Sequence, residues 1–274
     1  MRVNTNSISM GAQRTLGNVR QDQDRAVNRL SSGDRIYEAA QDPSGLAISE
    51  KMTASIRSMQ QAERNSLEAI SMFQVGEGAL STIQEISVRL KELAMQAAND
   101  TLGDGDRLTV EKEYQAMKQE ISRISASTEY CGRKLLDGHG EFYEMQVGIN
   151  NSKHEKINYD MAKILSKTDL FGAGSTSVVT KEKAQDAVGD LVGMVDEISR
   201  SRAQIGSISS RMQSSIQNVM ISRENLSASR SKIRDADYAQ ETAANVRAGL
   251  LTETSTMALK SINTTPALAL RLLS

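Results

Sequence analysis

The chain has 274 residues, of which 39% are hydrophobic and only 3% aromatic, and it contains no tryptophan. This is little material for the thick core of a globular enzyme, and it favours helices packed in narrow layers. Lysine and arginine total 33 against 34 aspartate and glutamate residues, so the sequence offers no basic field for nucleic acid.

The sequence has no apolar run long enough to span a membrane, and residues 1–16 lack the apolar segment of an ordinary secretory signal. From these features alone, we expect either a cytoplasmic protein or one exported by a route that does not read such a signal.

The first half of the chain has helical periodicity of increasing strength. Residues 1–30 carry a weak apolar stripe, and such a helix would be marginal alone in water. From Leu46 to about Ala98, apolar residues recur mostly at gaps of three or four, which predicts one long amphipathic helix. A reversal at residues 99–106 leads to a second helix that extends through Ile124.

The middle of the chain changes period. Apolar residues alternate with polar ones at residues 145–149 and again at 157–161, which predicts a β-hairpin. Residues 166–180 are rich in glycine, serine and threonine and predict a short exposed loop.

The strongest pattern lies between residues 181 and 233, where apolar side chains recur at every seventh position. A strict heptad keeps one seam against a partner helix, and 42 residues of helix would span roughly 63 Å. A stripe of this length needs other long helices beside it. A weaker helix covers residues 243–257, and Pro266 is expected to end that pattern. The heptad positions are Leu191, Ile198, Ile205, Met212, Val219, Leu226 and Ile233.

We therefore predict a mainly α fold, an elongated antiparallel bundle or coiled coil of long helices with one small β-hairpin region. The terminal helices are expected to form a second coiled-coil segment. Their stripes are too thin to fold independently, so their burial requires neighbouring subunits.

The sequence offers little for catalysis. His139 and His154 are both flanked by glycine or polar turn residues, and neither has a positioned partner. No nucleophile elbow, phosphate-binding glycine loop or paired-carboxylate motif is found, so we expect no enzyme activity and no cofactor.

Residues 100–111 resemble the spacing of an EF-hand calcium loop between two helices. However, Leu102 occupies a ligand position and Arg107 a position that is normally apolar. An acidic turn between helices is the better interpretation, and we expect no metal site. We expect the single cysteine, Cys131, to be a small buried residue rather than a reactive thiol.

Several stretches resemble bacterial flagellin. They begin with MRVNTN at residue 1 and include LSSGDRIYEAAQDPSGLAISEKM (30–52), RLKELAMQAAND (89–100), YCGRKLLDG (130–138) and SRENLSASRSKIRDADYAQET (222–242). The last stretch, from Pro266 to Leu273, is also similar.

The resemblance implies a secreted filament subunit, exported unfolded through the flagellar type III channel and polymerised beneath a cap. It implies partnership with itself, an export chaperone, the filament cap and junction proteins, with no nucleic acid and no membrane span.

The resemblance also assigns roles along the chain. Residues 1–43 and 234–274 would be the two halves of an inner-tube domain, whose helices order on assembly. Residues 44–165 and 181–233 would form the rod domain, and the loop at 166–180 replaces the outer domains of longer relatives.

The chain departs from the flagellin pattern at a few positions. Asp34 stands where relatives usually have leucine, Pro43 and Ser44 replace a common alanine pair, and Cys131 replaces a usual asparagine. The first two changes are expected to tune a turn.

Three groups of site residues follow from the resemblance. Arg89, Leu93 and Glu113 match the surface read by the innate flagellin receptor of animals, although Met117 replaces a second expected arginine. Ser175, Thr176 and Ser177 are candidates for modification. The predicted subunit-interface and inner-tube packing residues are Leu16, Val19, Leu30, Arg35, Asp42, Leu46, Arg234, Asp235, Asp237, Tyr238, Val246, Leu250, Leu251, Met257, Leu272 and Leu273.

Two alternatives share the helical pattern. A hook–filament junction protein has the same paired terminal helices, but the central matches at 89–100 and 130–138 favour flagellin. A cytoplasmic helical scaffold or calcium-responsive switch would require calcium binding at residues 100–111.

Overall fold

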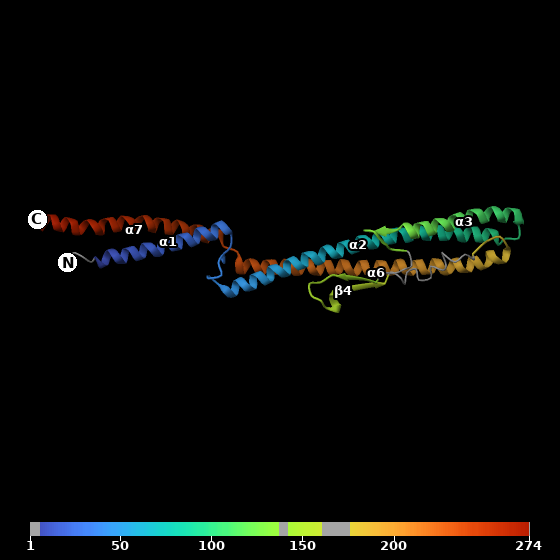
Figure 1. Ribbon diagram of the computed structural model, residues 1–274, viewed down its shortest axis with the longest axis horizontal. Helices are drawn as coiled ribbons and strands as arrows, with labels where there is room; N and C mark the ends of the chain where they lie inside the picture. Colours follow the sequence, from blue (N-terminus) through green and yellow to red (C-terminus); the bar gives the residue numbers. More distant parts are fainter. Residues whose placement is uncertain (1–5, 137–141, 161–175, 274) are drawn as a thin grey trace. The chain divides into compact units, whose positions relative to one another are not determined.

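The computed structural model describes residues 6–136, 142–160 and 176–273 (Figure 1). Long helices dominate this part of the chain, and its strands form two short antiparallel hairpins, so the predicted mainly α fold is confirmed. No helix among the described residues combines the length and apolar character needed to cross a membrane. The long helices are α1 (Ser7–Ser32), α2 (Pro43–Ala97), α3 (Asp104–Ser127), α6 (Lys181–Arg234) and α7 (Tyr238–Leu273). The shorter elements are β1 (Glu129–Tyr130), β2 (Arg133–Lys134), β3 (Phe142–Gln146), the 3-10 helix η1 (Lys153–Glu155) and β4 (Lys156–Asp160).

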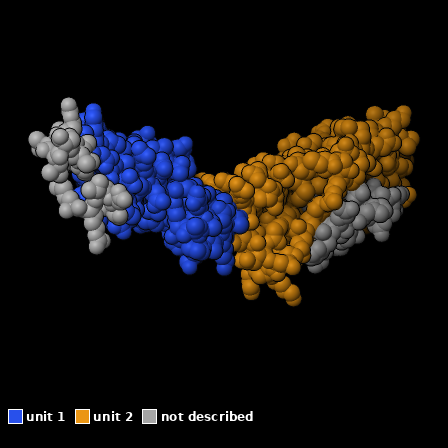
Figure 2. Space-filling view, turned by 60° about the vertical axis from the view of Figure 1, so that its left-hand side comes forward, with its two compact units in different colours: residues 1–56, 224–274 blue, residues 57–223 orange. Residues whose placement is uncertain are grey.

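The chain divides into two compact units, which Figure 2 shows in different colours. Unit 1 comprises Met1–Ile56 and Glu224–Ser274, and unit 2 comprises Arg57–Arg223. Helices α2 and α6 each contribute to both units. The predicted boundaries between inner-tube, loop and rod regions, at residues 43, 165, 180 and 233, rest on roles in the filament and stay a prediction.

In unit 1, α1 and α7 lie side by side and antiparallel (Figure 1). The Asn6 side chain caps the start of α1 by accepting a hydrogen bond from the Ser9 amide at 3.2 Å. Gly33 ends the helix with φ of 73°, a left-handed conformation that glycine adopts without steric cost.

In unit 2, the core lies between α2, α3, α6 and the hairpins. Phe73, Leu80 and Ile83 on α2 and Tyr114 and Ile121 on α3 are almost completely buried. The first four heptad positions of α6 are also buried, whereas the last three are half-buried, so the seam is best covered near the start of the helix. The buried four are Leu191, Ile198, Ile205 and Met212, and the half-buried three are Val219, Leu226 and Ile233.

The predicted hairpin is present as β3 and β4, with Met145 opposite Ile157. It pairs residues 142–146 with 156–160, earlier than the alternation suggested. The reason is a bulge, because the amides of Val147 and Gly148 both donate to the Glu155 carbonyl, at 2.9 and 3.2 Å. The strand pairing therefore ends before Ile149.

The expectation that Pro266 ends the last helix is wrong, because α7 continues as helix to Leu273. Proline removes one helical donor, which leaves the carbonyl four residues earlier without its usual partner. The helical turns before and after Pro266 are nevertheless continuous.

The predicted exposed loop is partly wrong. Residues 166–175 lie outside the described residues, but Val178 is fully buried, and its amide donates to Glu111 Oε2 at 2.6 Å. Glu111 and Gln115 of α3 thus fix the segment that leads into α6.

Candidate assembly surface

The contact between α1 and α7 is built largely from polar and small side chains. Arg29 Nη1 donates to Glu241 Oε1 at 3.0 Å, and the Ser9 hydroxyl donates to Asn263 Oδ1 at 3.1 Å. The buried residues of this pair include Ala26 and Ala248. These hydrogen bonds, one near each end of the pair, specify the register of the two helices.

Several large apolar side chains of the pair are exposed to solvent. In α7, Val246, Leu250 and Met257 are spaced so that they share one face, and each is about 60% exposed. An open groove runs along the same helix, lined by Tyr238, Ala239, Thr242, Ala243, Val246, Arg247, Leu250 and Leu251. The other exposed apolar side chains of the pair are Ile8, Met10 and Val27 on α1.

This α7 face, defined here by Tyr238, Val246, Leu250, Leu251 and Met257, consists of five predicted interface residues. Contiguous exposed apolar surface of this kind marks an interaction site, since exposing it to water is unfavourable. Of the remaining predicted residues on these helices, Leu16, Val19 and Leu30 are half-buried. The structure describes only the helical backbone of Leu272 and Leu273.

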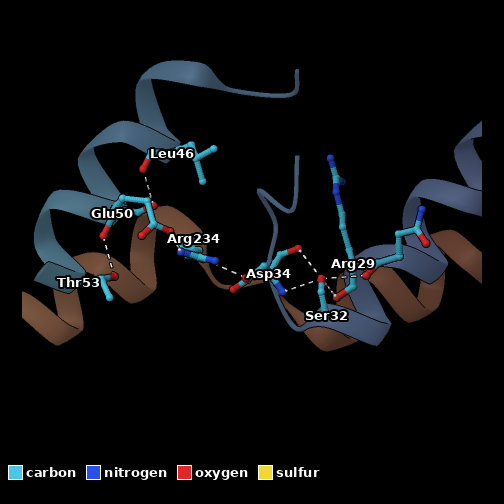
Figure 3. Close-up of polar contacts among 9 residues, drawn as sticks. Arg29, Ser32, Asp34, Leu46, Glu50, Thr53 and Arg234 are labelled. Carbon is cyan, nitrogen blue, oxygen red and sulfur yellow. Dashed lines mark hydrogen bonds and ion pairs between the residues drawn. The ribbon is translucent and has the colours of Figure 1, made fainter. Parts of the chain in front are cut away.

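A cluster of ionic contacts in unit 1 joins the segment after α1 to the last residue of α6 and to the first turns of α2 (Figure 3). Arg234 Nε donates to Asp34 Oδ2 at 2.9 Å, and Arg234 Nη1 donates to Glu50 Oε1 at 2.5 Å. We call these three residues the Arg234 clasp. The hydrogen bonds from Asp34 and then Glu50 raise the pKa of the Arg234 guanidinium above its usual value.

Backbone pairing reinforces the Arg234 clasp. The Arg35 amide donates to the Arg234 carbonyl at 2.6 Å, and the Ala236 amide donates to the Gly33 carbonyl at 2.9 Å. This makes a short antiparallel bridge between Asp34 and Asp235. Arg35 also donates from Nη2 to the Ile233 carbonyl at 2.6 Å, which satisfies a carbonyl at the end of α6.

Two predicted residues beside the clasp are helix caps. Asp42 Oδ1 accepts from the Gly45 amide at 2.8 Å, directly before Pro43 begins α2. Asp237 Oδ1 accepts from the amides of Ala239 and Gln240 at 2.9 and 3.2 Å, at the start of α7. Leu46, in the first turn of α2, is half-buried.

The clasp explains one departure from the flagellin pattern. Where relatives usually have leucine, Asp34 supplies an acceptor to Arg234. The sequence showed the unusual residue and the charged run around Arg234, but it gave no indication that they meet across 200 positions.

Replacing Arg234 with glutamine is expected to destabilise unit 1 by about 1–2 kcal/mol. Both ion pairs are partly exposed, so each is worth about 1 kcal/mol or less. Hydrogen exchange should accelerate at the amides of Arg35 and Ala236. Arg25→Gln is the control, because Arg25 pairs with Asp22 on its own helix. Equal exchange rates in both variants would contradict a structural role for the clasp.

The residues matched to the receptor surface differ in their exposure to solvent, because Arg89 and Glu113 are exposed and Leu93 is buried. Arg89 Nη2 contacts Glu113 Oε1 at 2.9 Å, and Arg89 Nη1 contacts Glu92 Oε2 at 3.0 Å, all on the exposed faces of α2 and α3. Hydrogen bonds to Glu113 and then Glu92 raise the pKa of Arg89. Leu93 is only 2% exposed in the single chain, and its matched place on the receptor surface stays a prediction. The periodicity of α2 makes it a core position.

In the turn whose spacing resembles an EF-hand calcium loop, Arg107 donates hydrogen bonds to backbone carbonyls at the end of α2. Arg107 Nε donates to the Ala97 carbonyl at 3.0 Å and Nη2 to the Asn99 carbonyl at 3.2 Å, so it caps the end of α2. Asp100 instead pairs with Lys181 at 2.7 Å, and hydrogen bonding to Lys181 lowers the pKa of Asp100. Within residues 6–136, 142–160 and 176–273, no cluster of candidate ligands is placed to hold a metal ion.

The expectation that Cys131 is buried is wrong. Cys131 and Gly132 connect β1 to β2 with φ of 50° and 79°, and the cysteine is exposed. Two positive φ angles are typical of a type I′ turn, which favours asparagine and then glycine. The usual asparagine therefore fits the turn better than cysteine, and the side chain points outward for the same reason.

The remaining expected positions have these outcomes. His139 and Ser175 lie outside the described residues, and His154 is exposed in η1. Thr176 and Ser177 are half-buried, and the Thr176 carbonyl accepts from Gln115 Nε2 at 3.4 Å.

Solved structures support the fold. The protein is similar to Bacillus cereus flagellin, with a TM-score of 0.51 and 28% identity over 57% of this chain and 88% of that one. A putative flagellar hook-associated protein from Vibrio parahaemolyticus gives a TM-score of 0.57 at 11% identity, covering 71% of this chain and 100% of that one. At 11% identity, the similarity to the Vibrio protein shows only that the two proteins share a fold.

Sequence comparisons extend over the whole chain. A flagellin from Halalkalibacterium halodurans is 36% identical over 100% of both chains. The flagellar filament 33 kDa core protein of Treponema phagedenis is 32% identical over 96% of each chain. The bacterial flagellin N-terminal helical region matches residues 3–141, and the bacterial flagellin C-terminal helical region matches residues 188–273. Taken with the paired terminal helices and their exposed apolar face, these matches show that the chain belongs to the bacterial flagellin family.

Proposed function

We infer that this protein is a structural subunit of the bacterial flagellar filament, located outside the cell, and that the α7 face makes its essential contacts. The proposal that the α7 face makes these contacts rests on which side chains of the terminal helices are exposed. The described residues of the pair that are buried are polar or small, and several large apolar side chains, Val246, Leu250 and Met257 among them, are left exposed.

Such helices gain most of their stability from burial against a partner. Repeated copies of one chain can provide that burial through heterologous contacts, which generate an open helical polymer when the rotation does not close. The terminal helices then order fully as the subunit binds, and the entropy of ordering is offset by the apolar area buried.

The other proposed roles follow from family membership. The predicted interface residues that form caps and the clasp position the terminal helices, while the α7 face binds neighbouring subunits. Before assembly, the export chaperone is the expected partner of the exposed apolar segments, and the cap and junction proteins contact the filament ends. The protein acts through assembly and not through catalysis.

Arg89 and Glu113 form an exposed pair that an animal receptor could contact in the dispersed subunit. The buried Leu93 supports a smaller recognition surface than the matched motif implies. Modification at Thr176 or Ser177 would need access to half-buried positions beside α3.

Seeded growth tests the filament function against the junction alternative. Purified chain is added to short fragments of its own filaments, and lengths are measured by electron microscopy. A filament subunit is expected to extend the seeds continuously into long, smooth filaments. Seeds that stop after one added layer would indicate a junction protein. Seeds that do not grow would contradict both the filament and the junction function.

A further inference from the structure

The heptad seam of α6 cannot by itself select one register against α2. Its seven positions are all apolar, so a shift of one heptad replaces each apolar side chain with another. In each of these alignments an apolar side chain of α6 packs among the side chains of α2. The register must therefore be set by residues that differ along the helix. A second row of α6 begins three residues before the first, is only partly apolar and contains such residues. Its members are Val188, Val195, Arg202, Ser209, Ile216, Arg223 and Arg230.

Two arginines of this second row contact α2 within unit 2. Arg202 Nη1 donates to Gln84 Oε1 at 2.6 Å, and Arg202 Nη2 lies 3.9 Å from Glu77 Oε1. Gln84 also donates to the Ser199 hydroxyl at 3.3 Å. Arg223 Nη1 donates to Glu63 Oε2. We call the contacts of Arg202 and Arg223 with α2 the register pairs.

The register pairs agree with one another. Arg202 and Arg223 lie three heptads apart on α6, and their partners Gln84 and Glu63 lie three heptads apart on α2. Both pairs therefore specify the same antiparallel alignment.

Alignments shifted by one heptad disturb the two register pairs unequally. A shift of one heptad brings Arg223 opposite Ile56 in one direction or Ile70 in the other, and these side chains are 8% and 9% exposed. Arg223, whose side chain is 30% exposed, would lose its carboxylate beside these apolar groups, which is unfavourable although solvent screens part of the charge.

In the first direction Arg202 comes opposite Glu77. In the second it comes opposite Lys91, while Arg230 comes opposite Glu63. Each shift therefore allows one arginine–glutamate pair but breaks the combination of contacts that the register pairs make.

We propose that the register pairs act as a lock that admits one alignment of α2 and α6 and excludes shifts by one heptad. The lock determines which side chains of the two helices reach the subunit surface. It therefore fixes the surface that unit 2 presents to any neighbour.

Distances between spin labels on α2 and α6 test the lock directly. Cysteines replace the exposed Met95 and Ile221, in full-length protein that also carries Cys131→Ser. Labelled chains are diluted into a large excess of unlabelled chains, so that only distances within one subunit are measured by pulsed electron resonance. A shift of one heptad moves one helix along the other by about 10 Å.

The starting protein is expected to show one distance. Arg202→Met with Arg223→Met is expected to add a second distance displaced by about 10 Å, because the uniform seam then tolerates a shift. The matched control is Arg200→Met with Arg211→Met, two exposed arginines of the same helix, and it should retain one distance. A single unchanged distance in the Arg202 and Arg223 variant would overturn the proposal.

A charge exchange provides a second test that does not depend on the methionine variant folding. Glu63→Arg alone opposes two cations in the observed register and is expected to broaden or split the distance. Glu63→Arg combined with Arg223→Glu restores the attraction and should recover the single distance. One unchanged distance in both variants would show that apolar packing sets the register and would overturn the proposal, and so would a distribution that stays equally broad after the exchange.

Discussion

Replacing Val246 and Leu250 together with glutamate is expected to abolish filament growth while leaving the dispersed subunit as stable as before. Both side chains are about 60% exposed in the subunit, so the new carboxylates are solvated and should change its stability by about 0.5 kcal/mol or less. On assembly, however, the same carboxylates would be buried against a neighbour without a partner.

Burying an unpaired charge costs several kcal/mol even after local relaxation. Each 1.4 kcal/mol changes an equilibrium constant about tenfold, so we expect the critical concentration for polymerisation to rise at least about 100-fold. Sedimentation of polymer at increasing protein concentration measures this quantity, and thermal unfolding checks the subunit.

The matched control adds the same two charges to α7 at polar positions. Gln240→Glu with Thr256→Glu changes two exposed residues of the same helix, neither of which lies three or four positions from a residue of the α7 face. This variant is expected to polymerise at a critical concentration much closer to that of the starting protein. Similar losses in both variants would indicate that net charge, and not the α7 face, controls assembly.

Replacing Phe73 with alanine is expected to destabilise unit 2 by about 3–5 kcal/mol. Phe73 is fully buried on α2, and its ring contacts that of Tyr159 edge to face, with centroids 5.2 Å apart and an interplanar angle of 85°. The substitution removes this aromatic contact and leaves a cavity between α2 and strand β4.

Denaturant unfolding measures the loss, and hydrogen exchange at the amides of β4 locates it. Val75→Ala is the control, since Val75 lies two residues further along α2 and is 42% exposed. The control is expected to lose less than about 1 kcal/mol. If both variants unfolded at the same denaturant concentration, the hairpin would not depend on Phe73.

The long helices could be predicted from the sequence because their stability follows from periodic burial. The stripe beginning at Leu191 predicted α6 almost to its last residue, and the shorter gaps after Leu46 predicted α2. These patterns depend on which residues are apolar and how they are spaced, and both properties are visible in one sequence.

Features that depend on distant partners were harder to predict. Asp34 is an unremarkable turn residue until Arg234 is placed beside it, and Leu93 looks like a surface residue when matched by motif alone. Cys131 was expected to be buried because cysteine usually is, but the backbone conformation of its turn directs the side chain outward. In each case, the tertiary or turn context outweighed the average behaviour of the residue.

The α7 face could be predicted in part. Val246, Leu250 and Met257 were visible as a weak stripe, and the expectation that such a stripe is too thin for an independent pair of helices stays a prediction. It could not show that polar contacts such as Arg29 with Glu241 join α1 to α7 and leave that stripe exposed.

Hydrogen exchange at residues 238–257, compared between dispersed chain and assembled filament, tests the central claim most directly. If the α7 face is the contact between subunits, exchange there should become slower by about 100-fold or more on assembly, corresponding to at least about 2.7 kcal/mol of added protection. Unchanged exchange across these residues in well-formed filaments would place the essential contacts elsewhere and contradict the account.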